Sequence, residues 1–190
     1  MTVGRGGGGE GETMAILKVS RLGHPVLRRM AEPVAPDMIA RPQFQQFIDD
    51  MIETMHEYDG VGLAAPQVHV SQQVAVLEVN KPPRYPDAPF VPLTILINPH
   101  VTLLTQDTVD GWEGCLSIPE MRGVTPRYRE LRVEALDRHG QPLNFVAVDF
   151  HARVIQHEYD HLQGKVYVDR MPSLETLTHL LEWQRYWLKS

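Results

Sequence analysis

A chain of 190 residues with 43% hydrophobic and 22% charged residues has the composition of a globular protein and is long enough to bury a core within one domain. Its formal net charge of −6 argues against a protein that holds nucleic acid or an anionic membrane through its overall charge. No apolar run approaches the roughly 20 residues that a membrane-spanning helix needs. The single cysteine and the lack of an apolar leader in the first residues favour the reducing environment of the cytosol.

The first half of the chain predicts an arm followed by a helix. The glycine-rich start, residues 1–14, predicts a disordered arm, and we expect a single domain over residues 15–190. Apolar residues then recur at spacings of three and four in residues 44–55, which indicates one face of an amphipathic helix. Pro42 ahead of this run and Gly60 beyond it are typical of a helix start and stop.

Strands are predicted in the middle of the chain. Residues 74–79 and 93–98 are rich in β-branched side chains and are separated by a proline-rich loop. Residues 131–136 and 144–150 alternate on either side of the turn-like sequence DRHG, which predicts an antiparallel hairpin. Residues 151–164 then have helical character.

Gly164 is expected to end this helix as its C-terminal cap. Beyond it, an apolar pattern predicts a second amphipathic helix that includes Leu174, Leu177, Leu180, Leu181, Trp187 and Leu188. The elements together predict an α+β fold. In this fold, antiparallel or mixed sheets pack around the helix of residues 151–164, with one amphipathic helix near each end of the domain.

The pentapeptide His157-Glu158-Tyr159-Asp160-His161 is the most specific local pattern in the sequence. Histidines four positions apart lie about 40° apart around a helix, so both imidazoles can reach one metal ion. Glu158 points to another side of the helix but can lean over the site as a general base. Because a chance pair of histidines has the same spacing, the position of a third ligand decides between a metal site and coincidence.

Two sources of a third ligand are open. Zinc peptidases with this pattern commonly take a downstream residue, and the acidic or imidazole candidates are Asp169, Glu175, His179 and Glu182. Cys115 lies upstream in the sequence Gly-Cys-Leu-Ser, and a thiolate is a good ligand for zinc or ferrous iron. A Cys-His-His set with one open position would suit a catalytic metal.

Three segments resemble the signature motifs of peptide deformylases: GVGLAAPQ at 60–67, EGCLS at 113–117 and HEYDHLQG at 157–164. Their order and spacing also match, and the similarity extends from about residue 15 to 171. The resemblance implies a metal-dependent hydrolase. Its reaction would remove the formyl group from N-formylmethionine at the start of newly made polypeptides and release formate.

The resemblance also implies the parts of the active site. Cys115, His157 and His161 would hold one divalent metal, which is Fe(II) in the cell, with zinc, nickel or cobalt in some preparations. A water on this metal would attack the formyl carbon while Glu158 acts as general base and then as general acid. The Gln67 side chain and the Leu116 backbone N–H would stabilise the negative oxygen that forms.

Further residues carry over from the family pattern. Gly60 and Gly62 would line the substrate site, with positive φ angles at both glycines that leave a backbone edge open to a peptide. The full set of expected substrate-binding residues is Gly60, Val61, Gly62, Gly114 and Arg122. Glu113, Arg127 and Asp160 would support the metal ligands from behind, with Arg127 paired to Asp160.

One variable segment lies just ahead of the histidines. His151-Ala152-Arg153 stands where many bacterial members have apolar residues that line the methionine pocket. Trp112 and residues 121–123 resemble a branch found in some Gram-negative bacteria and in organelles. The expected partners are formylated nascent polypeptides and the ribosome near its exit tunnel, with no specific nucleic acid and no membrane. The expected location is the bacterial cytoplasm, with an organelle matrix as the alternative.

Two other functions remain open at this stage. A zinc endopeptidase would use the histidine pair with a downstream acidic ligand instead of Cys115. A non-catalytic protein would use the Cys-His-His set as a structural site or would only bind formyl peptides. Because structural zinc sites usually have four protein ligands, this alternative needs a fourth ligand such as His151 or His179.

Overall fold

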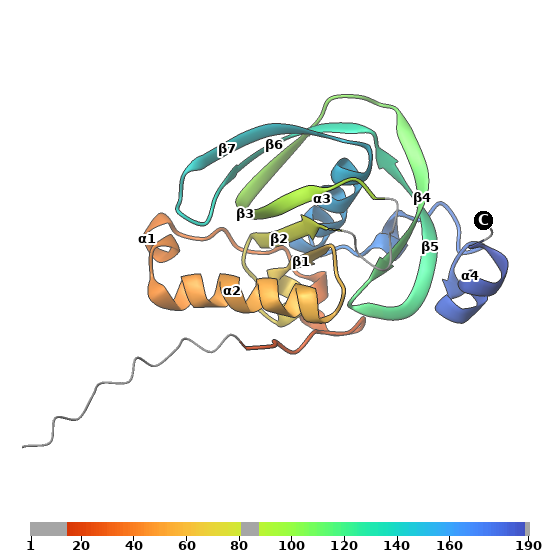
Figure 1. Cartoon of the computed structure of the whole chain (residues 1–190), viewed down its shortest axis with the longest axis horizontal. Helices are drawn as coiled ribbons and strands as arrows, with labels where there is room; N and C mark the ends of the chain where they lie inside the picture. Colours follow the sequence, from red (N-terminus) through yellow and green to blue (C-terminus); the bar gives the residue numbers. More distant parts are fainter. Residues whose placement is uncertain (1–14, 81–87, 189–190) are drawn as a thin grey trace, which may run out of the picture.

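The computed structural model describes residues 15–80 and 88–188 and shows α-helices and antiparallel sheets in one α+β arrangement (Figure 1). The predicted arm, residues 1–14, lies outside the described residues. The α-helices are α1 (Pro36–Ile39), α2 (Pro42–Glu57), α3 (Asp149–Leu162) and α4 (Leu180–Tyr186). Short 3-10 helices are η1 (Pro25–Arg28), η2 (Ala65–Val68) and η3 (Tyr167–Arg170). The strands are β1 (Gly62–Ala64), β2 (Val74–Val79), β3 (Val91–Leu103), β4 (Thr108–Cys115), β5 (Ile118–Tyr128), β6 (Glu130–Leu136), β7 (Pro142–Val148) and β8 (Thr178–His179).

The larger sheet has the strand order β1-β2-β3-β6-β7, and every neighbouring pair in it is antiparallel. Both faces of β2 are covered, which explains why its sequence is a continuous apolar run instead of an alternating one. Val74 and Val76 pack with the apolar face of α2, whereas Leu77 and Val79 pack with residues of α3. The core therefore lies on both sides of this sheet.

The predicted hairpin is confirmed in β6 and β7, where Leu131 pairs with Ala147 and Leu136 with Pro142. The Asp137 side chain accepts hydrogen bonds from the backbone N–H groups of His139 and Gln141, each at 2.8 Å. These bonds close the turn between the two strands. The hairpin leads directly into α3, so its register determines where the histidine-bearing helix begins.

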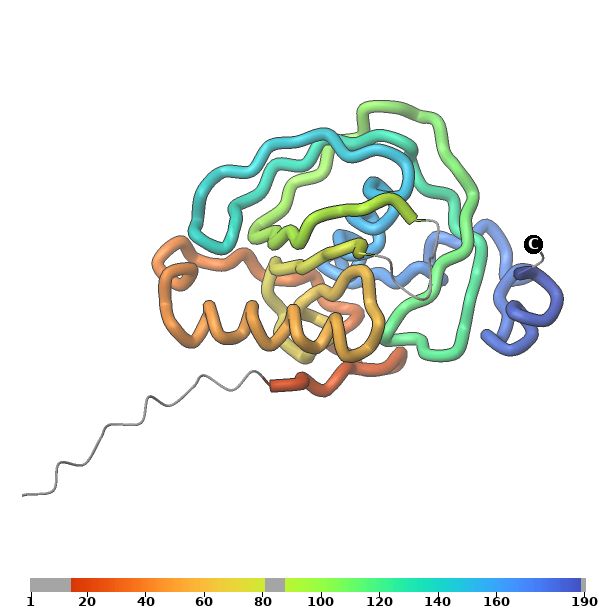
Figure 2. Tube along the Cα trace, in the orientation of Figure 1, coloured from red at the N-terminus to blue at the C-terminus, as the bar shows by residue number. Residues whose placement is uncertain are grey.

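Helix α3 lies between the larger sheet and the β4–β5 ribbon, as the two views of the chain trace show (Figures 1 and 2). Gly164 ends the helix with a φ of 70°, as its sequence position predicts. The Gly164 N–H donates to His161 and the Lys165 N–H to Asp160, which is the bond pattern of a Schellman motif. His161 lies on the last turn of α3 and His157 lies one turn before it, so this fixed helix end holds both histidines in place.

The C-terminal region differs from its prediction in extent. A helix is present, but α4 is confined to Leu180–Tyr186. Ahead of it, β8 pairs antiparallel with β5, and Arg122 lies opposite Thr178. The predicted helix cannot include Thr178 and His179, because the backbone groups of these residues pair with β5. Of the helices in the described part of the chain, none is long and apolar enough to cross a membrane.

Candidate metal centre and active site

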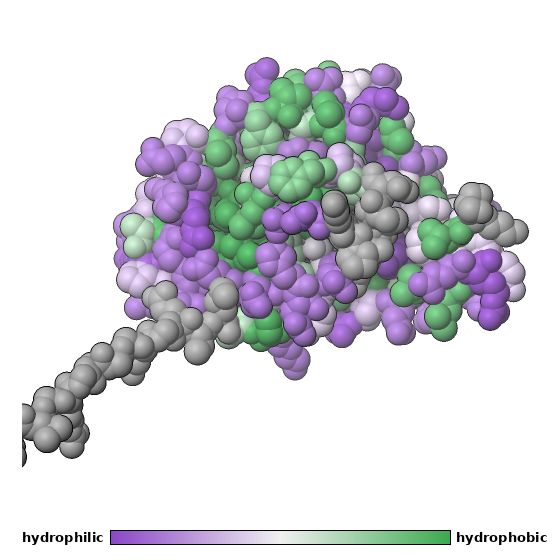
Figure 3. Space-filling model, in the orientation of Figure 1, coloured by the Kyte–Doolittle hydropathy of each residue, from purple (hydrophilic) through white to green (hydrophobic). Residues whose placement is uncertain are grey.

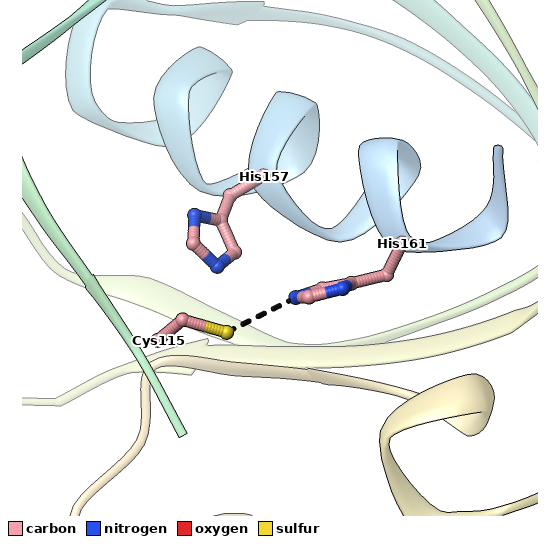
Figure 4. A group of neighbouring side chains, drawn as sticks. All are labelled: Cys115, His157 and His161. Carbon is pink, nitrogen blue, oxygen red and sulfur yellow. Dashed lines mark hydrogen bonds between the residues drawn. The ribbon is translucent and has the colours of Figure 1, made fainter. Parts of the chain in front are cut away.

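Cys115, His157 and His161 come together between β4 and α3 (Figure 4). Each offers one ligand atom, and these atoms all lie within 4.8 Å of one another. Cys115 Sγ lies 3.3 Å from His161 Nε2. The two histidines share one face of α3 because they are four residues apart, and Cys115 reaches them from the last position of β4.

The chemistry of these three donors fits a divalent transition metal. A thiolate and two imidazoles suit zinc or ferrous iron, and three protein ligands leave a position open for water or substrate. No other group of three potential ligands with this spacing occurs in residues 15–80 and 88–188. The downstream candidate Asp169 instead pairs with Arg28 and accepts a hydrogen bond from the Val166 N–H.

The charges in the site favour the binding of a metal ion. Burial opposes ionisation of Cys115, but His161 and His157 outweigh it and hold the pKa of the thiol well below its usual value. A low thiol pKa favours the thiolate, which is the form that binds metals. Burial raises the pKa of Glu158 to about 7, although both histidines oppose that shift. A carboxyl with this pKa can take up and release a proton near neutral pH.

Glu158 is buried in a pocket beside Cys115, and its Oε2 atom has no hydrogen-bond partner among the described residues. Gly62 lies so close that a Cβ atom there would overlap the Glu158 carboxylate. The prediction of positive φ at Gly60 and Gly62 is wrong, since neither is among the glycines with positive φ. Glycine is needed at position 62 for a steric reason, because any side chain there would occupy the space of the Glu158 carboxylate.

Gln67 is almost fully buried, and the Ala64 N–H donates to its Oε1 atom at 2.8 Å. This bond fixes the amide so that Nε2 faces Cys115 Sγ and Ser117 Oγ, each at 3.4 Å. Leu116 follows Cys115 directly and lines the same pocket. The structure therefore places both expected oxyanion-stabilising residues beside the candidate ligand Cys115.

The substrate-binding candidates divide between two places. Gly60, Val61, Gly62 and Gly114 line the pocket of Glu158. Arg122 lies in a neighbouring groove, where its guanidinium occupies the space that a side chain at Gly114 would need. This close contact accounts for glycine ahead of Cys115.

Glu113 is the centre of a buried charge network behind His157. Its carboxylate accepts a hydrogen bond from His157 Nδ1 at 2.8 Å and two from Arg127 at 2.9 Å each. Arg127 also donates to Asp160 at 2.6 Å, so the predicted contact between these two residues is present. Burial alone would raise the pKa of Glu113, but Arg127 and His157 hold that pKa far below its usual value. The network fixes the orientation of the His157 ring.

Arg153 belongs to this network, although the sequence placed it only in a variable pocket segment. Its guanidinium donates to Glu113 at 2.8 Å. It also donates to backbone carbonyls of both ribbon strands, including Val109 at 2.5 Å and Thr125 at 2.8 Å. Arg153 thus ties α3 to β4 and β5. The available sequence signal was an arginine on a helix face whose neighbours are apolar.

We expect Arg153→Met to lower the free energy of unfolding by about 2–3 kcal/mol, because buried carbonyl acceptors lose their donor. Chemical denaturation of the purified variant measures the change. Arg129→Met is the matched control, because Arg129 is exposed and pairs with Asp149 only at 3.7 Å. Equal stability of the two variants would contradict the structural role of Arg153.

The fold and these residues define a class: an α+β hydrolase whose histidine-bearing helix and lone cysteine suit a divalent metal. The family model of polypeptide deformylases matches residues 16–177. The chain belongs to the polypeptide deformylase family. Members are enzymes that remove the N-formyl group from new polypeptides, so the predictions of the enzyme class, the reaction and the fold are confirmed.

Relatives and solved structures agree with this assignment. The chain is 47% identical over 156 residues to peptide deformylase 2 of Pseudomonas putida, covering 82% of this chain and 88% of the relative. It is 49% identical over 160 residues to peptide deformylase 1 of Bordetella pertussis, covering 84% and 88%. A class I type b peptide deformylase of Acinetobacter baumannii with bound Met-Ala-Ser has a TM-score of 0.81 and 36% identity, covering 84% of this chain and all of that chain.

Proposed function

We propose that deformylation takes place in the pocket beside Cys115, with Cys115, His157 and His161 holding one divalent metal. The observation that carries this proposal is the buried group of three ligand atoms next to Glu158, whose Oε2 atom has no hydrogen-bond partner among the described residues. The bound cation would act as a Lewis acid on the formyl group and on water. The surrounding residues supply orientation, proton transfer and charge stabilisation.

Glu158 is the proposed proton carrier. Its carboxylate accepts a proton from the attacking water, and the same proton is then given to the leaving amine nitrogen as the C–N bond breaks. Formate and a free amino terminus result. Glu158 Oε2 has no hydrogen-bond partner in the described part of the chain, which supports this role, since a carboxylate engaged with arginine would be held ionised.

Gln67 and Leu116 are the proposed stabilisers of the oxygen that gains negative charge. The Gln67 amide is already oriented by Ala64, so it needs no rearrangement during the reaction. We expect Gln67→Ala to lower kcat about 100- to 1,000-fold with a smaller effect on KM. Steady-state formate release measures both constants. A loss confined to KM would show that Gln67 only binds the substrate.

The proposed substrate site is the edge of β1. This strand stands at one end of the strand order and pairs only with β2 in its sheet, so its other side faces away from the paired strands. A peptide could add there as a further strand, with Val61 and Gly62 as its backbone partners. Phe150 and Val154 line the pocket and supply apolar contact for a methionine side chain. Glu113, Arg127 and Asp160 support the ligands as described.

The finer biological setting is also proposed. We infer Fe(II) as the metal in the cell, the bacterial cytoplasm as the location, and one catalytic domain over residues 15–190. The ribosome near its exit tunnel is the proposed partner. Exposed apolar side chains on and beside α4, among them Leu181 and Trp187, support contact with a large partner (Figure 3). No specific nucleic-acid binding is expected.

The test of this function is formate release from formyl-Met-Ala-Ser by protein purified without oxygen. We expect release that a chelator abolishes and an added divalent metal restores. Protein that binds metal stoichiometrically but releases no formate would overturn the proposal. Cleavage of internal peptide bonds would instead favour the endopeptidase alternative.

A further inference from the structure

The short helix η3 follows α3 after residues 163–166 and belongs to none of the three signature motifs. Its Asp169 side chain accepts a hydrogen bond from the Val166 N–H at 2.9 Å, which caps the start of η3. The same carboxylate pairs with Arg28 at the end of η1. These contacts hold η3 in place without involving either histidine, so η3 can act as a fixed support for its neighbours.

Tyr167, the first residue of η3, stacks on the ring of His157. The two ring centroids lie 6.2 Å apart with 18° between the ring planes, and Tyr167 is only 1% exposed. Glu113 meanwhile bonds to His157 Nδ1 at 2.8 Å. The imidazole is therefore held at one edge by a carboxylate and on one face by a stacked aromatic ring.

Arg170, the last residue of η3, reaches the same histidine by a second route. It donates three hydrogen bonds to Asp160, at 2.5, 3.0 and 3.1 Å, and engages both carboxylate oxygens. Asp160 is almost fully buried and also accepts from Arg127, which bonds in turn to Glu113. A continuous chain of charged hydrogen bonds thus runs from Arg170 to His157.

The charges of this chain explain why Arg170 matters at a distance. Asp160 shares two cations, Arg127 and Arg170, and Glu113 also depends on Arg127. Without Arg170, the buried Asp160 carboxylate would draw more strongly on Arg127, because an unpaired buried charge is costly. Glu113 would then share its cation less favourably, and its hold on the His157 ring would loosen.

We propose that Tyr167 and Arg170 are positioning residues, which keep His157 oriented for the metal and thereby slow the loss of the bound ion. One short element supports the same ligand by two routes, through the ring face and through the charged chain. This inference rests on the proposed metal centre, because His157 must be a ligand for its orientation to affect metal release.

The experiment measures how fast the Co(II)-loaded full chain loses its metal to an excess of chelator, followed by the visible absorption of bound Co(II). We expect Tyr167→Leu to speed this loss about 10- to 100-fold, the usual cost of removing a group that orients a ligand. Arg170→Met acts through three other side chains, so we expect a smaller effect of about 3- to 10-fold. Tyr167→Phe keeps the stacked ring and should stay within about threefold of the unaltered protein.

Two control variants separate positioning from general stability. Phe44→Leu also truncates a buried aromatic ring, but Phe44 lies in the first turn of α2, whereas the active-site pocket begins beyond the end of that helix. Arg41→Met removes another exposed arginine that pairs with an aspartate, Asp37. Both should leave the rate of metal loss within about twofold, because changes at distant sites act independently.

An unchanged rate in Tyr167→Leu or in Arg170→Met would overturn the role of that residue while leaving the proposed function intact. Arg170 is half-exposed, so its variant tests the proposal even if Tyr167→Leu fails to fold. Equal acceleration in the Phe44 or Arg41 variant would also overturn the proposal, since the effect would then come from stability alone. Failure of the unaltered protein to bind Co(II) would instead contradict the proposed metal centre itself.

Discussion

Glu158→Gln is expected to lower kcat for formate release about 100- to 10,000-fold, which is the usual contribution of a general acid–base group. The amide keeps the size of the carboxylate and can occupy the same space beside Gly62, but it cannot take a proton from water. Because Cys115, His157 and His161 are unchanged, metal content should stay at the level of the unaltered protein. Steady-state kinetics and elemental analysis of the same sample measure both quantities.

Glu134→Gln is the control for this substitution, because Glu134 is exposed on β6. It should leave kcat within a factor of two, an estimate that follows from the small effects of surface changes away from a site. If Glu158→Gln retained most of its activity with full metal content, another group would have to carry the proton. If it lost its metal, its role would be in binding instead of proton transfer.

Arg127→Met is expected to lower the free energy of unfolding by about 3–5 kcal/mol, since removing one partner leaves Glu113 and Asp160 as buried charges. Arg127 is 4% exposed and bonds to both carboxylates. The same change loosens Glu113, which orients His157, so metal affinity should fall about 10- to 100-fold. Denaturant unfolding and competition with a metal-binding dye measure the two effects.

Arg132→Met provides the matched comparison. It replaces the same type of side chain, but Arg132 is exposed on β6 and lies outside the network. Its stability should differ by less than about 0.5 kcal/mol from that of the unaltered protein. If the Arg127 variant kept its stability but bound metal more weakly, the network would serve to orient His157 and would not be needed for folding. Unchanged values for both would contradict the function assigned to the Glu113 network.

Sequence patterns predicted the features that depend only on residues close together in the chain. The histidine pair needed only the 3.6-residue repeat of one helix, and the Gly164 cap needed only the backbone freedom of glycine. The convergence of Cys115 on that helix required three motifs together, because its position depends on the register of β4 against β5. Periodicity alone left the third ligand undecided.

The remaining features depend on packing between segments far apart in the sequence. Arg153 belongs to no sequence motif, because its acceptors are carbonyls on β4 and β5 that lie 28 to 44 residues away in the sequence. Gly62 was expected to have an unusual φ, but its constraint is the Glu158 side chain on another element. The C-terminal helix was predicted too long, because strand pairing between β8 and β5 takes its first residues.

The central claim is that Cys115, His157 and His161 hold the metal on which deformylation depends. Its most direct measurement is a titration of metal-free protein with Fe(II) under anaerobic conditions, following bound metal and formate release together. We predict that activity rises in proportion to bound metal and stops at one ion per chain, and that Cys115→Ala shows neither. Full metal binding and activity in Cys115→Ala would contradict the claim.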